Sequence, residues 1–140
     1  PFYWNAERSD GTTMPPPDCE LPEEYPLGSL QEQRNNDASL WNYYRQAIAI
    51  RQALPALSHG RTTAETALNV GCVSAFRKTW NDQSVIVLMN IDTVAASVDL
   101  SAYGDWVLAA SLSADGNEVV LNGSTLELPA FATAILIPNV

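Results

Sequence analysis

The first part of this 140-residue chain is rich in carboxyl groups. Its acidic side chains before the first helical pattern include Glu7, Asp10, Asp18, Glu20, Glu23 and Glu24. Two carboxyl groups about 5 Å apart, one with a raised pKa, can act as nucleophile and general acid in hydrolysis. Such a pair needs rigid walls around it, and this proline-punctuated stretch predicts none. We therefore interpret these residues as a solvated acidic loop without a catalytic role.

The other reactive side chains are one histidine and two cysteines. His59 has no second histidine or cysteine cluster to complete a zinc site, and Ser58-His59 lacks an acid at the spacing of a hydrolase triad. We expect a structural role for His59. Cys19 and Cys72 could form one disulfide, which would favour an oxidising compartment, or could remain two unpaired thiols. The sequence leaves both alternatives open.

Aromatic side chains offer a different chemistry, because sugar rings stack on the exposed faces of Trp and Tyr. Packing is the expected role of the aromatic residues that fall in periodic patterns, namely Trp41, Tyr43, Tyr44 and Trp106. Trp80 instead lies beside the turn dipeptide Asn81-Asp82, where we expect its ring to be exposed. Trp80 is therefore a candidate carbohydrate-binding residue.

Charge and composition exclude several classes of function. The net charge is −9, from seven basic and sixteen acidic residues, so the clustered basic surface that binds nucleic acid is not expected. The longest apolar run, around Ile86 and Met89, has the length of a buried strand and falls far short of the roughly 20 residues that span a bilayer. A neutral polysaccharide remains compatible as a partner, because its binding does not depend on net charge.

The elements that must position these residues begin with a helix. Apolar residues recur at helical spacing over residues 39–54, Ser39 or Asp37 can cap the first turn, and Pro55 ends the pattern. Residues 1–36 carry six prolines and no sustained period, which predicts an irregular loop. Its many apolar anchors indicate that this loop packs on a larger body.

From residue 61 the pattern changes to short strands separated by turns. Strands are expected over residues 62–68, 73–79, 84–91, 98–100, 106–112 and 133–137, and on both sides of Asn122-Gly123. Residues 84–91 form an unbroken apolar run that predicts a strand buried on both faces. Seven or eight such strands predict a mainly β protein, built as an antiparallel β-sandwich after one long helix.

Two details of this strand pattern are specific enough to be tested. The alternating residues of 106–112 are expected to point to one side of the sheet, namely Trp106, Leu108, Ala110 and Leu112. Asp115-Gly116 and Asn122-Gly123 predict tight hairpin turns with a positive φ at each glycine.

The run SLWNYYRQAIAIRQALPALSHG resembles the last barrel helix of the α-amylase family of glycoside hydrolases, whose pattern is S-L-x-N-Y-Y-x-x-x-I-x-x-R-x-x-x-P-A-L. Five other segments are similar to that family. PFYWNAERSDG resembles the segment after the last catalytic loop, and SLQEQRNNDASLWNYY resembles the link before the helix. The C-terminal sandwich of the family is matched by VSAFRKTW, SVIVLMNID and STLELPAFATAILIP. The resemblance covers nearly the whole chain.

The resemblance implies two domains and a Greek-key sandwich. Residues 1–60 would end a (β/α)₈ barrel, and residues 61–140 would form the C-terminal β-sandwich. Family members use a retaining mechanism with an Asp nucleophile and a Glu acid/base, and these residues lie upstream of the first segment matched here. No catalytic residue can therefore be assigned to this chain. Tyr3 and Trp4 would lie near the mouth of the barrel, where they are candidate substrate-binding residues.

The function implied is that of a non-catalytic C-terminal fragment of an α-glucan-active enzyme, of the α-amylase or α-glucosidase type. Its partners would be the missing barrel, an α-glucan, or a second copy through the uncovered helix face; nucleic acid and membrane are not expected. We expect no metal or cofactor in this chain, although the resemblance is compatible with calcium in the longer enzyme. A secreted or periplasmic location is slightly favoured. The alternatives are a stand-alone carbohydrate-binding sandwich and an interaction sandwich that binds no glycan.

Overall fold

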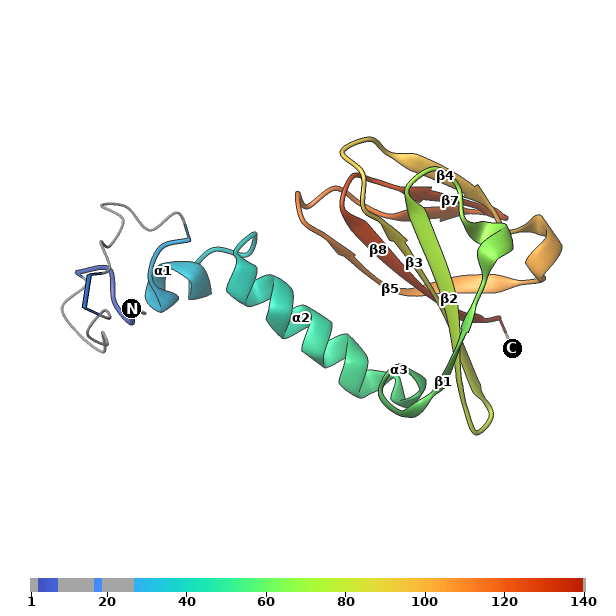
Figure 1. Cartoon of the computed structure of the whole chain (residues 1–140), viewed down its shortest axis with the longest axis horizontal. Helices are drawn as coiled ribbons and strands as arrows, with labels where there is room; N and C mark the ends of the chain where they lie inside the picture. Colours follow the sequence, from blue (N-terminus) through green and yellow to red (C-terminus); the bar gives the residue numbers. More distant parts are fainter. Residues whose placement is uncertain (1–2, 8–16, 19–26, 140) are drawn as a thin grey trace. The chain divides into compact units, whose positions relative to one another are not determined.

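The structure is a computed structural model that describes residues 3–7, 17–18 and 27–139. It divides into two compact units, residues 1–46 and 47–140, and each is described by itself below (Figure 1). The predicted boundary between residues 60 and 61 concerns the domains of a longer protein and stays a prediction. Within the described residues, no helix is both long and apolar enough to cross a membrane.

The first unit contains a short helix that the sequence analysis missed. Helix α1 spans Leu30–Arg34, inside the stretch 1–36 that was expected to be irregular. A capping box forms it: the Glu32 backbone N–H donates to Ser29 Oγ, and the Ser29 backbone N–H donates to Glu32 Oε2. The pattern Ser-x-x-Glu was the available signal, and it outweighed the prolines that precede it.

Helix α2, Leu40–Ala53, confirms the predicted helix over residues 39–54. The Asn42 backbone N–H donates to Ser39 Oγ at 3.2 Å, so Ser39 caps the first turn as expected. Pro55 ends α2 and begins a second short helix, α3, over Pro55–His59. Proline favours that first position because its missing N–H would have no partner there.

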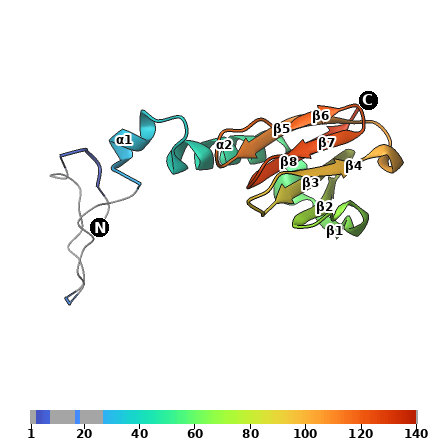
Figure 2. The ribbon, with the colours of Figure 1, turned by 90° about the horizontal axis from the view of Figure 1, so that it is seen from above.

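The second unit carries eight described strands: β1 Arg61–Ala64, β2 Val73–Trp80, β3 Gln83–Asn90, β4 Ala96–Asp99, β5 Trp106–Ser113, β6 Val120–Asn122, β7 Thr125–Leu128 and β8 Ala132–Pro138. They form a five-stranded sheet in the order β1-β2-β3-β8-β5 and a three-stranded sheet in the order β4-β7-β6. Every pairing is antiparallel (Figures 1 and 2). The predicted antiparallel β-sandwich is confirmed.

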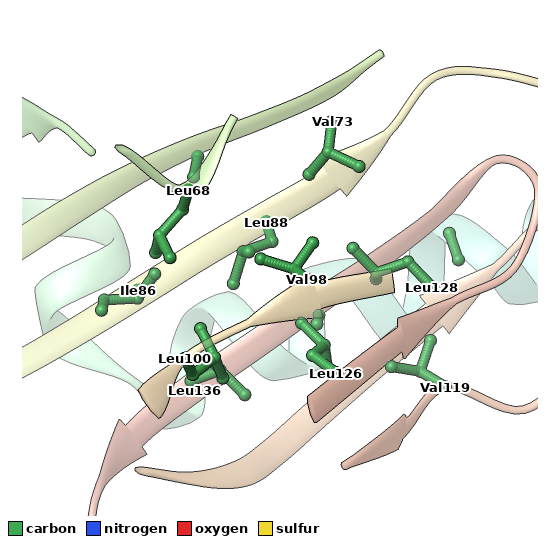
Figure 3. Packing of buried hydrophobic residues seen from close by; sticks show 13 residues of the cluster. Leu68, Val73, Ile86, Leu88, Val98, Leu100, Val119, Leu126, Leu128 and Leu136 are labelled. Atoms are coloured by element: carbon green, nitrogen blue, oxygen red, sulfur yellow. The ribbon is translucent and has the colours of Figure 1, made fainter. Parts of the chain in front are cut away.

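The core of the sandwich lies between the two sheets. Figure 3 shows side chains from both sheets meeting there, with Ile86 and Leu88 of β3 facing Val98 of β4 and Leu126 of β7. All four are at most 1% exposed. Burying side chains of this size contributes about 1.5–3 kcal/mol each, which makes this layer the main source of stability in the unit.

A second apolar cluster covers the outer face of the five-stranded sheet. Val85 and Val87 of β3 pack there with Ile135 of β8, and the end of α2 and helix α3 supply the cover through Ile50, Leu54, Ala56 and Leu57. Strand β3 therefore has apolar layers on both faces. This confirms the prediction from its unbroken apolar run.

Strand β5 corrects the expectation that Trp106, Leu108, Ala110 and Leu112 all point one way. Leu108 pairs with Leu136, whereas Ala110 pairs with Ile135, so a bulge at Ala109 inserts one residue into the strand. The bulge reverses the alternation after it. Trp106 and Leu108 consequently pack in the core between the sheets, whereas Ala110 packs in the outer cluster.

The segment expected as a first strand over residues 62–68 is also shorter than predicted. Strand β1 ends at Ala64, and a 3₁₀ turn, η1, covers Thr66–Leu68. This turn carries Leu68, which is 1% exposed, into the core between the sheets. A straight strand would have continued along β2 without filling that space. A second 3₁₀ turn, η2, covers Ser101–Tyr103.

The two Gly turns have the predicted backbone, but only one joins paired strands. Gly116 has φ 78° and Gly123 has φ 59°. Gly123 lies in the turn of the β6–β7 hairpin, as expected. Gly116 connects β5 to β6, which belong to different sheets, so the hairpin predicted at Asp115-Gly116 is wrong.

Candidate binding surface at the turn between β2 and β3

Trp80 is the last residue of β2, and its side chain is 43% exposed. It pairs with Gln83 across the turn formed by Asn81 and Asp82. Asn81 has φ 49°, a left-handed conformation that asparagine tolerates better than most residues. This tight turn ends the hairpin directly beside Trp80, so little chain is left to cover the indole.

His59, the last residue of α3, packs against Trp80. The two ring centroids are 5.3 Å apart, and the ring planes meet at 42°. The sequence analysis gave His59 a structural role, and the structure adds a specific aromatic partner. No local signal marked this pair, because 20 residues separate the two rings along the chain.

Helix α3 is fixed to the β2–β3 hairpin by hydrogen bonds to two of its residues, Ala56 and Leu57. The Ala56 N–H donates to Gln83 Oε1 at 2.6 Å, which satisfies a free donor of the first turn. Lys78 Nζ donates to the Leu57 carbonyl at 2.7 Å. Side chains of the hairpin thus hold the helix that carries His59, and the two rings are positioned before any ligand arrives.

Gly60 allows this close approach. A Cβ atom at Gly60 would lie 2.3 Å from the Ala56 carbonyl oxygen and 3.1 Å from the backbone N and O of Thr79. Its φ of −69° suits any residue, so the requirement for glycine comes from contact with backbone atoms. Any side chain here would push α3 away from β2 and separate His59 from Trp80.

Polar residues border Trp80 at the end of the hairpin. Gln83 lies opposite it, and Asn81 and Asp82 form the turn beside it, whereas Thr79 and its partners Ser84 and Arg61 alternate to the other face of the sheet. In the part of the chain that the structure describes, the side chains of Asn81 and Asp82 make no hydrogen bond or ion pair with the protein. These donors and acceptors are available to a ligand.

Two other tryptophans, Trp106 and Trp41, are engaged by protein side chains or backbone. Trp106 donates from Nε1 to the Tyr103 carbonyl at 2.8 Å, and the Arg77 guanidinium lies 5.1 Å from its ring centroid. Arg77 is itself held by Glu65 at 2.6 Å. A hollow of about 380 Å³ borders Trp106, but this ring already has partners. Trp41 lies beneath the guanidinium groups of Arg34 and Arg45, at 5.4 and 5.5 Å.

Tyr3 and Trp4 lie in the first unit, next to α1. Their backbone carbonyls accept hydrogen bonds from Leu30 at 3.0 Å and Gln31 at 3.1 Å. The Trp4 side chain is 50% exposed, whereas Tyr3 is half-buried. A substrate-binding role for these two residues stays a prediction.

Among the residues that the structure describes, no carboxyl group has the raised pKa of a glycosidase acid. The pKa of Asp99 is lowered because the backbone N–H and the hydroxyl of Ser101 donate hydrogen bonds to its carboxylate. The pKa of Asp115 is lowered chiefly because the Ser113 hydroxyl donates a hydrogen bond to its carboxylate. A general acid needs the opposite shift. Glu7 and Asp18 are exposed. Four candidates of the acidic loop lie outside the described residues: Asp10, Glu20, Glu23 and Glu24.

Cys72 and Asp92 form a small surface pair elsewhere on the sandwich. Their side-chain hydrogen bond lowers the pKa of Asp92 and raises the pKa of the exposed Cys72 thiol. Cys72 is free, and Cys19 lies outside the described residues, so the disulfide remains untested. Among the described residues, no cluster of three or more His, Cys, Asp or Glu side chains could hold a metal ion.

No protein-family model and no curated protein match this chain. Solved structures do match it. Amy13B of Eubacterium rectale superimposes with a TM-score of 0.90 at 27% identity, over 99% of this chain and 27% of its own. A mutant isomaltulose synthase of Erwinia rhapontici NX5, in complex with D-glucose, superimposes with a TM-score of 0.74 at 26% identity, over 100% of this chain and 25% of its own. The α-amylase of H. orenii superimposes with a TM-score of 0.73 at 24% identity, over 99% of this chain and 28% of its own. This likeness supports the fold alone.

These neighbours are enzymes of the α-amylase family, and this chain spans about a quarter of their length. Its sandwich is similar to the C-terminal domains of amylases. Over almost all of its residues, the chain is thus similar to one segment of α-amylase family enzymes.

Proposed function

We propose that this chain is the C-terminal portion of an α-amylase-family glycoside hydrolase, comprising the end of the barrel, its last helix and the sandwich. One observation carries the proposal: the likeness to Amy13B extends over 99% of this chain but only 27% of that one. The longer enzyme would cleave or transfer α-glucosidic bonds in starch-like or malto-oligosaccharide substrates by a retaining mechanism. Its nucleophile and acid/base would lie in the remaining part.

The role of this chain in such an enzyme would be to stabilise the barrel, and helix α2 supports this role. Leu40, Tyr44 and Ile48 are four residues apart, so they share one face of the helix. They are 45%, 61% and 55% exposed, respectively. Further along α2, Ile50 packs on the outer cluster of the sandwich. One end of the helix is thus covered by the sandwich, whereas the rest presents apolar side chains to a missing partner.

The occupant of this exposed face is the catalytic barrel of the same polypeptide. Neighbours about four times as long as this chain contain the same segment, so the additional chain needed to cover the face exists in them. Burying three side chains of this size would contribute on the order of 5 kcal/mol, a large share of the stability of a typical domain. Without the barrel, the same face would favour self-association.

Tyr3 and Trp4 would supply a contact to substrate in the longer enzyme. The half-exposed Trp4 ring could stack on a sugar near the active site, while α1 fixes the backbone of both residues. Trp4→Ala should then raise KM for malto-oligosaccharides more than it lowers kcat. An unchanged KM would remove Trp4 from the site.

The decisive experiment is to sequence the reading frame upstream of the codon for Pro1 and to express the longer polypeptide. We expect a barrel with the Asp, Glu and Asp motifs of the family, and hydrolysis of α-glucans with retained anomeric configuration. An upstream frame without these motifs, or a longer polypeptide inert on starch, maltose and sucrose, would overturn the proposal.

The helix face can be tested separately by measuring oligomeric state and stability. Tyr44→Ala should lower the Tm of the longer polypeptide and reduce association of the 140-residue chain in light scattering. Gln46→Ala, on an exposed polar residue of the same helix, is the matched control and should change neither. Equal effects of the two variants would contradict the assignment of this face to the barrel.

A further inference from the structure

We infer that Trp80 and His59 form an auxiliary α-glucan-binding platform on the sandwich, remote in sequence from the residues that would carry catalysis. The inference rests on the proposed function for the class of its ligand. Trp80 is 43% exposed, and its ring meets the His59 ring at 42° with centroids 5.3 Å apart. A glucose unit presents an apolar C–H face of matching size, which stacks on an exposed indole.

The platform is rigid, and this separates it from an incidentally exposed tryptophan. Gln83 and Lys78 hold Ala56 and Leu57 of α3 through bonds of 2.6 and 2.7 Å, and Gly60 lets the end of the helix lie close to the backbone of Thr79. The rings therefore lose little conformational freedom on binding, which is the condition under which a small contact area gives measurable affinity.

The surroundings of Trp80 favour a sugar over a protein as the ligand. The residues that border its ring at the end of the hairpin are polar: Asn81 and Asp82 in the turn, and Gln83 across from it. A protein-docking patch needs contiguous apolar surface, which these positions do not supply. Sugar recognition instead needs an aromatic face bordered by donors and acceptors for hydroxyl groups. The free side chains of Asn81 and Asp82 meet that need.

The test is affinity electrophoresis of the 140-residue chain in native gels containing amylopectin, with a β-glucan gel as the comparison. We expect the amylopectin gel alone to retard the chain. Trp80→Ala should weaken binding about tenfold or more, as loss of a stacking contact implies. Trp80→Tyr, which keeps a flat ring, should retain part of the retardation, and His59→Ala should lose part of it.

Two controls separate binding from folding. Phe131→Ala removes another exposed aromatic ring, 48% exposed, from the loop between β7 and β8 and should leave retardation unchanged. Urea denaturation of Trp80→Ala and Trp80→Tyr should show both variants folded. Retardation that is absent, that survives Trp80→Ala, or that is equal in the β-glucan gel would overturn the platform. Failure of the proposed function would appear elsewhere, as an inactive longer polypeptide, because retention is measured here without catalysis.

Discussion

Asn90 provides a sharp test of how the sandwich is held together. This residue ends β3 and is 2% exposed. Its Nδ2 donates to the carbonyls of Val94 at 2.8 Å, Pro129 at 2.9 Å and Leu128 at 3.3 Å, while its Oδ1 accepts from the Asp92 N–H at 3.0 Å. One side chain thus ties the β3–β4 loop to the end of β7. Asn90→Ala would remove all four contacts.

The expected cost follows from the burial of these contacts. Each hydrogen bond contributes about 1 kcal/mol net, which sets an upper value of about 4 kcal/mol for Asn90→Ala. The Leu128 contact is buried, whereas the others are part-buried, so water would replace some of them. We therefore expect Asn90→Ala to lower the free energy of unfolding by about 2–4 kcal/mol.

Asn90→Asp should behave differently, because it places a carboxylate oxygen against three carbonyl oxygens. This repulsion and burial would raise the pKa of the new carboxyl above its unfolded value of about 3.9. The folded state then binds the proton more tightly, so this contribution to stability is present at low pH and is lost as pH rises through the folded pKa. At neutral pH the variant should be less stable than Asn90→Ala.

Urea denaturation followed by circular dichroism measures these effects. Asn139→Ala, on an exposed asparagine that follows β8, is the control and should stay within about 0.5 kcal/mol of the parent chain. If Asn90→Ala matched this control, or if acidification did not improve Asn90→Asp relative to Asn90→Ala, the four contacts would not hold the loops as argued.

Three further predictions concern the contact of Gly60 between α3 and β2, the hydrolytic activity of the chain and the pH dependence of its stability. Gly60→Ala should cost about 1–3 kcal/mol in urea denaturation and weaken amylopectin retardation, because its Cβ would overlap the Ala56 carbonyl oxygen; a neutral effect would show that α3 is loosely seated. The 140-residue chain should not hydrolyse starch, maltose or aryl α-glucosides, and turnover lost on changing an acidic residue between Glu7 and Glu24 would refute this. Stability should fall as pH drops below the ordinary carboxyl value of 3.8, because Asp92, Asp99 and Asp115 have lowered pKa values in the folded state and lose their contribution on protonation. In acid titration by circular dichroism, Asp99→Asn should reduce this pH dependence, and an unchanged dependence would contradict the assignment.

Local sequence determined those elements whose signals are complete within a few residues. Helix α2 follows from the capping Ser39, the helical spacing and Pro55, and β3 follows from an apolar run too long to be half-buried. The turn at Gly123 follows from an Asn-Gly pair between two strands. The exposure of Trp80 was predictable for the same reason, because the turn beside it is encoded by its own residues.

Tertiary structure decided what depends on distant partners. The bulge at Ala109 arises where β5 pairs with β8, so no property of β5 alone revealed that Ala110 would face the outer cluster. Leu68 left the expected strand because a space in the core between the sheets required an apolar side chain. His59 met Trp80 because Lys78, Gln83 and Gly60 seat α3 on the hairpin. Periodicity records which face of an element is apolar, whereas register, bulges and helix docking are set by contacts between elements, and the platform exists only through those contacts.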